Sequence, residues 1–229
     1  MRNRQWPKRE LVSAILYKID NGCKWRDLPH DFPPWQTVYS FFRRAKMSGL
    51  WDELLQFLFE ITRQIENRTS APSYAIIDSQ SIKTVSASED RGIDGGKKIK
   101  GRKRHIVVDT MGNLLSVVVH TANVHDTKAG ISAAKLAFRD YPQIRGFCAD
   151  AGYRGTFKRE VEEKLNVSVD ISERISGNKW EILPKRWIAE RTFAWMNHSR
   201  GLCKDYEITK SSAESMIKIA HSHILLKRL

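Results

Sequence analysis

The spacing of apolar residues changes near Pro72, after which helical periods give way to short β-branched runs. Before that point, Leu11, Ile15 and Ile19 recur at helical spacing and predict a helix over residues 8–20. Asn21-Gly22 is suited to end it, since both residues tolerate a left-handed backbone. A segment rich in Trp and Pro, residues 25–35, then predicts a rigid turn.

Two more helices are predicted over residues 36–46 and 50–66, separated by Gly49. Residues 1–70 therefore form a small helical module in this interpretation. Docking on DNA and a purely structural bundle both fit such a module. Its tryptophans, which lie beside helix ends, are expected to be core residues rather than platforms for base stacking; they are Trp6, Trp25, Trp35 and Trp51.

Residues 71–229 mix strands and helices. The run 74–77 ends at Asp78 and is typical of a buried strand, and Thr110-Met-Gly-Asn113 separates two β-branched runs as in a hairpin. Further elements are predicted as a helix at 126–139, a strand at 144–149, a helix at 156–165, a strand at 167–171, and helix from Lys185 with a break near Gly201. Residues 86–104 are expected to form a mobile loop. This order favours an α/β fold of the ribonuclease-H-like type, with three antiparallel strands continued by parallel ones and helices on both faces.

The charge of the chain favours a polyanionic partner. Thirty-nine Lys and Arg against 26 Asp and Glu leave a net charge of +13, which attracts nucleic acid and would also suit an anionic membrane. No apolar stretch approaches the roughly 18 residues that span a bilayer, and no secretory signal is evident. The three cysteines form no CxxC pair, so free thiols in a reducing cytoplasm are expected.

Three acids stand out by position. Asp78 and Asp150 each follow a buried run, and Glu190 lies on a helix whose apolar face includes Trp187 and Phe193. Converging carboxylates would make an oxygen site suited to Mg²⁺ or Mn²⁺. Each acid also has an ordinary explanation, because a strand-end Asp often caps a turn and Glu190 has arginine neighbours for a salt bridge.

Several runs of the chain resemble the DDE transposases of bacterial insertion sequences, in particular the insertion-sequence five family. The runs occur in the same order as in that family and cover nearly the whole chain: Gly22–Pro29, Trp35–Tyr39, Ile77–Lys83, Gly101–Thr110, Ala122–Asp126, Ala149–Gly155 and Arg186–Trp195.

The resemblance implies a ribonuclease-H-like catalytic domain in which Asp78, Asp150 and Glu190 are the catalytic acids and metal ligands. It implies two divalent ions, Mg²⁺ or Mn²⁺, that promote in-line displacement at phosphate. The expected partner is double-stranded DNA at the ends of the element and in the target. A homodimer on DNA, acting at the nucleoid in the bacterial cytoplasm, is also expected.

Two departures from the family pattern leave alternatives open. The family signature around the glutamate has Tyr and Lys where this chain has Leu183 and Asn197, while Arg186 and Glu190 match. Relatives usually carry a further helical segment before the first helix, which predicts a truncated copy or one frame of a frameshifted product. A catalytically silent DNA-binding remnant, and another nuclease on the same fold, are therefore the alternatives.

Ten cations are candidate DNA contacts. Six lie within eight residues before the hairpin, a density that favours gripping of phosphates over a merely solvated loop. The full set is Lys83, Lys97, Lys98, Lys100, Arg102, Lys103, Arg104, Arg154, Arg186 and Arg191. Asp109 and Asp126 could be mistaken for metal ligands, but Asp109 is placed to cap a turn without metal. His221-x-His223 lacks an evident third ligand.

Overall fold

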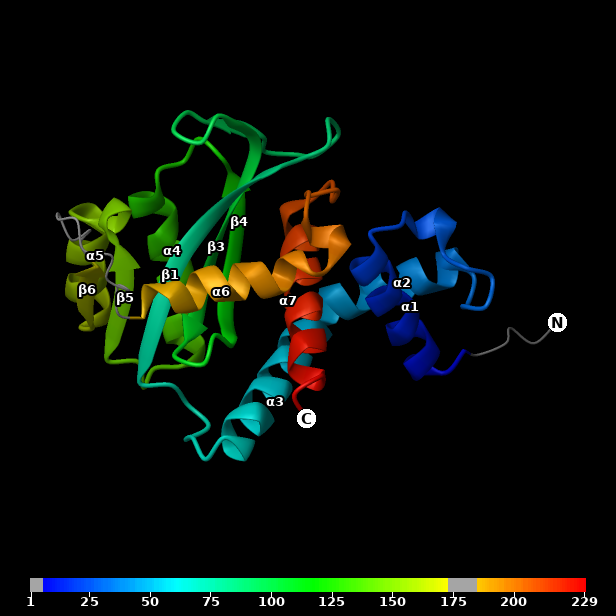
Figure 1. Ribbon diagram of the computed structural model, residues 1–229, viewed down its shortest axis with the longest axis horizontal. Helices are drawn as coiled ribbons and strands as arrows, with labels where there is room; N and C mark the ends of the chain where they lie inside the picture. The colour runs from blue at the N-terminus through cyan, green and yellow to red at the C-terminus, as the bar shows by residue number, and fades with distance from the viewer. Residues whose placement is uncertain (1–5, 173–184) are drawn as a thin grey trace, which may run out of the picture.

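The computed structural model describes residues 6–172 and 185–229, with the side chain of Arg186 outside the description. A helical module leads into one sheet (Figure 1). The last two helices pack back against it, α6 on β1 and β3, and α7 on β4 and on α3 of the module. The helices are α1 Lys8–Asn21, α2 Trp35–Ser48, α3 Leu50–Ile65, α4 Asp126–Asp140, α5 Thr156–Leu165, α6 Arg186–Asn197 and α7 Lys210–Leu226. The strands are β1 Tyr74–Lys83, β2 Gly92–Asp94, β3 Ile99–Asp109, β4 Leu114–Thr121, β5 Gly146–Asp150 and β6 Ser168–Ser172, and three short 3-10 turns are Trp25–Asp27, Ala151–Tyr153 and Arg200–Leu202.

Glycines end the first two helices as predicted. Gly22 follows α1 with φ 70°, and Gly49 follows α2 with φ 80°, a left-handed conformation that glycine adopts without steric cost. The module is held together by apolar packing around Trp51, which is 1% exposed. The expectation of core tryptophans is confirmed for Trp51, while Trp25 and Trp35 are only partly buried.

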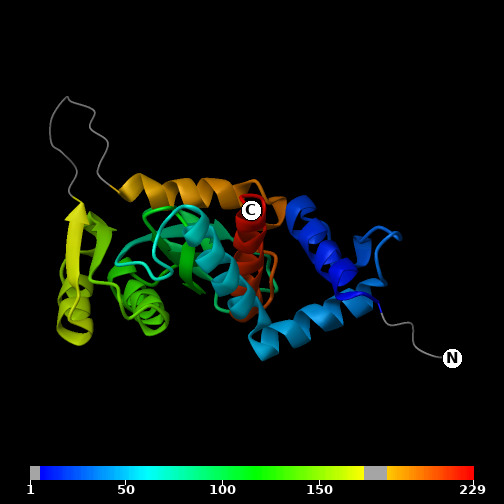
Figure 2. The same ribbon diagram turned by 90° about the horizontal axis from the view of Figure 1, so that it is seen from below.

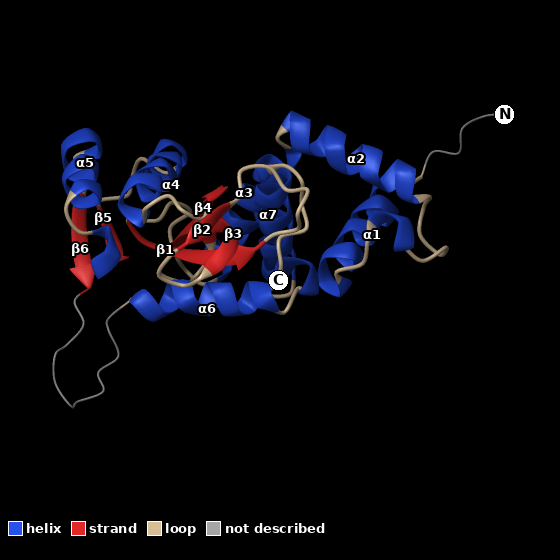
Figure 3. Cartoon of the chain, turned by 90° about the horizontal axis from the view of Figure 1, so that it is seen from above, coloured by secondary structure: helices blue, strands red, loops and turns tan. Residues whose placement is uncertain are grey.

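The sheet has the mixed order that the sequence predicts. β3 pairs antiparallel with both β1 and β4, and β2 adds to one end of β3. β1 then pairs parallel with β5, and β5 with β6. The spatial order β4-β3-β1-β5-β6, with α6 on one face and α4 and α5 on the other (Figures 2 and 3), is the ribonuclease-H-like arrangement.

The last helix covers the edge of the sheet. In the part of the chain that the structure describes, β4 pairs only with β3, so its outer N–H groups need partners from elsewhere. His221 Nε2 accepts a hydrogen bond from the Leu114 N–H at 2.9 Å, and Glu214 Oε1 accepts one from the Val119 N–H at 2.9 Å. Both side chains belong to α7, which also packs against α3.

The expectation of a mobile loop over residues 86–104 is wrong at the two places where strands form within it, β2 at Gly92–Asp94 and β3 from Ile99 onward. β3 begins at Ile99, so the second half of the basic run lies in a strand in the middle of the sheet. Arg102, Lys103 and Arg104 are 0%, 6% and 3% exposed. Their charges find partners from segments distant in sequence, and local composition contains no sign of these partners.

Candidate active site

Two of the three predicted acids lie side by side in the sheet. β1 and β5 run parallel, with Ile76 opposite Cys148. Two residues further along each strand are Asp78 and Asp150, which therefore share one level and one face. Each carboxylate is oriented by a main-chain N–H that follows it in sequence, Asp78 in the middle of β1 and Asp150 at the end of β5. Asp78 Oδ1 accepts from the Ser79 N–H at 2.7 Å, and Asp150 Oδ1 from the Gly152 N–H at 2.9 Å.

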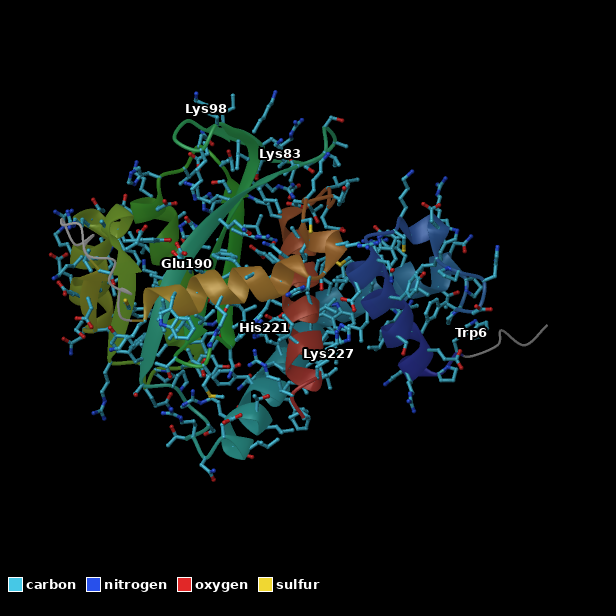
Figure 4. The ribbon with its side chains drawn as sticks, in the orientation of Figure 1. Trp6, Lys83, Lys98, Glu190, His221 and Lys227 are labelled. Atoms are coloured by element: carbon cyan, nitrogen blue, oxygen red, sulfur yellow. The ribbon has the colours of Figure 1, made fainter. Side chains whose placement is uncertain are left out.

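The third acid lies on the helix that covers this face. Gln80 lies on the same face of β1 as Asp78 and accepts hydrogen bonds from Arg104. The Arg104 guanidinium in turn lies over the ring of Phe193 in α6, so α6 covers the face that carries Asp78. Glu190 is exposed on α6 where the helix crosses β1 (Figure 4). Glu190 thus lies on the helix that covers the sheet face carrying Asp78, with its own side chain exposed. Among the described residues, however, no three His, Cys, Asp or Glu side chains are close enough together to hold a metal ion.

A buried tyrosine lies near these aspartates. Tyr153 is 1% exposed, and its hydroxyl lies beside the side chain of Ser79. Burial, followed by the negative charges of Asp78 and Asp126, raises the pKa of Tyr153 well above its ordinary value, and Asp150 adds to the effect. Tyr153 was not among the residues predicted for the site, although its position three residues after Asp150 was a usable signal.

Asp126 is a fourth carboxylate beside the site, and it is held by cations rather than left available. Its Oδ1 lies 2.9 Å from Lys103 Nζ and 3.4 Å from His105 Nε2, and it accepts a hydrogen bond from Ser79 Oγ at 3.1 Å. Burial alone would raise the pKa of Asp126, but hydrogen bonds from His105 and Lys103 outweigh it and hold the pKa well below the usual range. Asp126 therefore ties the residue after Asp78 to the start of α4.

Asp109 caps a turn without metal, as the sequence predicts. Its Oδ1 accepts from the main-chain N–H groups of Met111 and Asn113, both at 2.9 Å. Its Oδ2 forms a buried ion pair with Arg63 of α3 at 2.5 Å. His221, in the other suspected motif, is fully buried and bonds to the sheet edge.

The candidate DNA contacts separate into exposed and buried groups. Lys83, Lys97, Lys98 and Lys100 are exposed at one end of the sheet, where Figure 4 labels Lys83 and Lys98. Arg154 is exposed beyond Asp150. Arg191 is partly buried against Trp187 and Trp195 and donates to the Met111 carbonyl at 2.9 Å. Asn197 is exposed at the end of α6, and the Leu183 position lies outside the described residues.

The prediction that Arg102, Lys103 and Arg104 contact phosphates is wrong for the folded protein, because all three side chains are buried. Arg102 Nη1 binds Asp205 at 3.0 Å, and its other nitrogens donate to the carbonyls of Glu89 and Ile208. Lys103 binds Asp126, as described above. Arg104 donates to Gln80, and burial lowers the pKa of Arg104 to about 10. Arg102 thus holds β3 to the residue 205–208 segment, while Lys103 and Arg104 hold it to the start of α4 and to β1.

The sheet order, with two aspartates at the same level of neighbouring strands, defines the chain as a ribonuclease-H-like protein. Residues 69–225 match the family described as "Transposase DDE domain", and residues 1–55 match the description "transposase of IS4/5 family". The chain belongs to the transposase DDE domain family of insertion-sequence transposases, which confirms the resemblance seen in its motifs.

Two relatives come from Burkholderia cepacia. A transposase for insertion sequence element IS402 is 29% identical over 113 residues, which cover 44% of this chain and 52% of the relative. The "Insertion element IS402 uncharacterized 16.2 kDa protein" is 30% identical over 86 residues, which cover 37% of this chain and 57% of the relative. The chain thus matches little more than half the length of each.

Solved structures of transposases are similar at low sequence identity. The Drosophila P element transposase strand transfer complex has a TM-score of 0.38 and 11% identity, covering 99% of this chain and 60% of that one. The Mos1 strand transfer complex has a TM-score of 0.35 and 12% identity, covering 100% and 78%. The fold is therefore assigned from the strand order of the sheet and not from these similarities.

None of the described helices is long and apolar enough to cross a membrane.

Proposed function

We propose that this chain is a DNA transposase that cleaves the ends of an insertion sequence and joins them to target DNA, with Asp78, Asp150 and Glu190 as its catalytic acids. The observation that carries the proposal is the shared level of Asp78 and Asp150 on the sheet face beneath α6. Membership of the transposase DDE domain family supports it. In-line displacement at phosphate needs no covalent protein nucleophile, so this site requires only acids and bound ions.

The donor chemistry fits two divalent ions, Mg²⁺ or Mn²⁺, since all three side chains offer carboxylate oxygens. When bound, such ions activate the attacking water or 3′-hydroxyl and stabilise the leaving oxygen. Asp78 and Asp150 are oriented for this role by their main-chain hydrogen bonds. Glu190 does not join them in a three-ligand group in the structure, so the proposal requires α6 to bring it closer when DNA binds, as active-site contacts often tighten with substrate.

The exposed cations supply the grip on DNA in this proposal. Lys83 ends β1 five residues beyond Asp78, about 17 Å along the strand. Together with Lys97, Lys98 and Lys100 it forms a basic end of the sheet, and Arg154, Arg186 and Arg191 are proposed to contact phosphates nearer the acids. The helical module, residues 1–70, is proposed to dock on the duplex, and a homodimer to hold two element ends together.

Cleavage of labelled DNA that carries the element ends tests the proposal, with wild type compared to Asp78→Asn, Asp150→Asn and Glu190→Gln in Mg²⁺ or Mn²⁺. Each variant is expected to lose cleavage by at least about 100-fold while retaining DNA binding. Glu163→Gln, at an exposed carboxylate outside the site, is the matched control and keeps full activity. Strand transfer into a second duplex distinguishes a transposase from another nuclease.

Two results would overturn parts of this proposal. A wild-type chain that binds DNA and never cuts it with either metal is the catalytically silent remnant. Cleavage by Asp150→Asn at the wild-type rate removes the metal site proposed here and leaves the family assignment intact.

A further inference from the structure

A groove separates the helical module from the segment that follows α6. It has a volume of about 750 Å³, within the range of ligand sites. Its walls come from α1, the Trp25–Asp27 turn and α2 on one side, and from residues 201–212 on the other. In Figure 1 this second wall is the orange segment beside the blue helices. None of the three proposed catalytic acids lines this groove.

Close backbone approach fixes the floor of the groove. A Cβ on Gly201 would lie 2.7 Å from the carbonyl oxygen of Ile19, and a Cβ on Gly22 would lie 3.2 Å from the Arg200 and Gly201 main chain. Only glycine at these positions allows the turn at residues 200–202 to pack this closely on α1. The two walls are therefore held at a defined spacing.

Aromatic rings line both sides of the groove. Trp25, Trp35 and Tyr39 line the module side, and Tyr206 lines the other side. Trp25 is packed edge-on against Tyr39 at 5.3 Å, which holds the ring in place. Tyr39 is 38% exposed and Tyr206 is 51% exposed, although neither is needed to fill the core. Half-exposed rings on both walls are suited to stacking against a flat ligand.

Cations accompany these rings. Arg26 lies over the ring of Trp35 at 5.4 Å, and Lys24 is exposed beside it in the same lining. Glu207 is the carboxylate among the residues lining the groove, and Lys18 neutralises it at 3.4 Å. The remaining charge of the groove is positive and therefore complementary to phosphate.

We propose that this groove binds unpaired nucleotides of a DNA strand, with bases stacked on Tyr206 and the module's aromatic rings and phosphates held by Lys24 and Arg26. Interleaved aromatic and basic side chains are the combination that holds single strands without reading their sequence. A duplex end cannot present its base faces in this way until it is unpaired. The inference rests on the proposed DNA substrate but not on the assignment of the catalytic acids.

Binding of the full chain to two labelled duplexes in EDTA tests the proposal: one blunt, and one with a short unpaired extension carrying 2-aminopurine. The extended duplex is expected to bind about tenfold more tightly, with quenching of the 2-aminopurine fluorescence as the base stacks. Tyr206→Ala should remove most of this advantage and Tyr206→Phe should keep it. Ile208→Ala is the matched control, since Ile208 is 60% exposed in the same wall and cannot stack.

The outcomes separate the two proposals. Equal affinity for both duplexes overturns the groove assignment and leaves the DNA substrate in place. An equal loss in Tyr206→Ala and Ile208→Ala also overturns it, because the groove would then act as a general apolar surface for another ligand, such as a peptide. Absence of binding to either duplex overturns the proposed function and this inference together.

Discussion

At the residue scale, neighbouring cations of one basic run have opposite roles. Lys98 is exposed in the turn before β3, while Arg102, four residues later, is fully buried and bonded to Asp205. Exposed cations act on DNA through phosphate charge. Buried ones contribute to folding, because removing one partner leaves the other charge unpaired in a water-poor site.

Replacement of these two residues is therefore expected to give different defects. Lys98→Ala should reduce the slope of log affinity against log salt concentration by about 1, with little change in the free energy of unfolding. Arg102→Met should lower the free energy of unfolding by about 3–5 kcal/mol. Salt titrations of DNA binding and urea denaturation measure the two effects, and a normal stability of Arg102→Met would contradict the structural role.

His221 gives the protein a pH-dependent stability. Its Nε2 accepts the Leu114 N–H, which requires the neutral ring, and burial lowers the pKa of His221 to about 3. The unfolded chain has the ordinary value near 6.5, so unfolding takes up a proton between these two values, and stability is lost as the pH falls through this window. Between pH 6.5 and 5 the loss from this residue is about 2 kcal/mol.

Urea denaturation at pH 7.5 and pH 5 checks this expectation. His221→Gln cannot titrate, so its free energy of unfolding should change less with pH than that of the wild type. His30→Gln, at an exposed position, serves as the control and should follow the wild type. Identical pH profiles for the wild type and His221→Gln would be incompatible with a neutral, buried His221.

At the element scale, the β3–β4 turn supports the helix that carries Glu190. Gly112 in this turn has φ 85°, and its carbonyl accepts a hydrogen bond from Thr192 Oγ1 of α6 at 2.9 Å. A Cβ on Gly112 would lie 2.9 Å from both Thr192 Oγ1 and a ring carbon of Trp195. The turn and α6 are thus fitted to each other with no space for a methyl group.

Gly112→Ala is expected to lower the free energy of unfolding by about 1–3 kcal/mol, through backbone strain and the displaced contact. Gly95→Ala is the matched control, since nothing lies within 4 Å of a Cβ there, and its stability should equal that of the wild type. Thermal unfolding of the two variants side by side provides the measurement. Equal midpoints would show that the turn can move away from α6.

Elements with strong local signals were predictable from the sequence. The helix predicted at 156–165 is α5, Thr156–Leu165, because its apolar positions and its ends are set within the segment. The first strand of the hairpin was predicted only after a loop ending at residue 104, although β3 begins at Ile99. Its first half carries charges that are stable in a sheet only because Asp205 and Asp126 approach from elsewhere, and such contacts leave no local pattern.

The candidate site was predictable in its strand residues and less so in its surroundings. A run of apolar residues ending in Asp indicates a carboxylate on a buried strand, and the parallel register then places Asp78, in the middle of β1, beside Asp150 at the end of β5. The network of Lys103, Asp126 and Tyr153 depends on the packing of α4 and of the turn after β5. The catalytic assignment of the acids stays a prediction until cleavage is measured.

At the scale of the whole molecule, the helical module and the sheet share buried contacts. Arg63 of α3 forms an ion pair with Asp109 of β3, in which the side chains are 6% and 0% exposed. α7 packs against both α3 and β4. A division of the chain at residue 70 stays a prediction, but these contacts couple the two sides of that boundary energetically.

We therefore expect residues 1–229 to unfold in a single transition, with equal calorimetric and van 't Hoff enthalpies. Arg63→Met should lower the free energy of unfolding by about 3–5 kcal/mol by leaving Asp109 unpaired. Arg68→Met, at an exposed arginine nearby, is the control and should have little effect. A separate transition for the helical module in the wild type would contradict this coupling.

The cover that α7 gives to β4 has a consequence for synthesis on the ribosome. β4 ends at Thr121, but the helix whose side chains bond to its outer edge begins at Lys210. At ordinary rates of translation about 5–20 s pass between the two. During that interval the nascent chain carries an apolar strand with unsatisfied N–H groups, which is open to pairing with other nascent chains. Rapid synthesis or a bound chaperone should therefore raise the yield of folded protein.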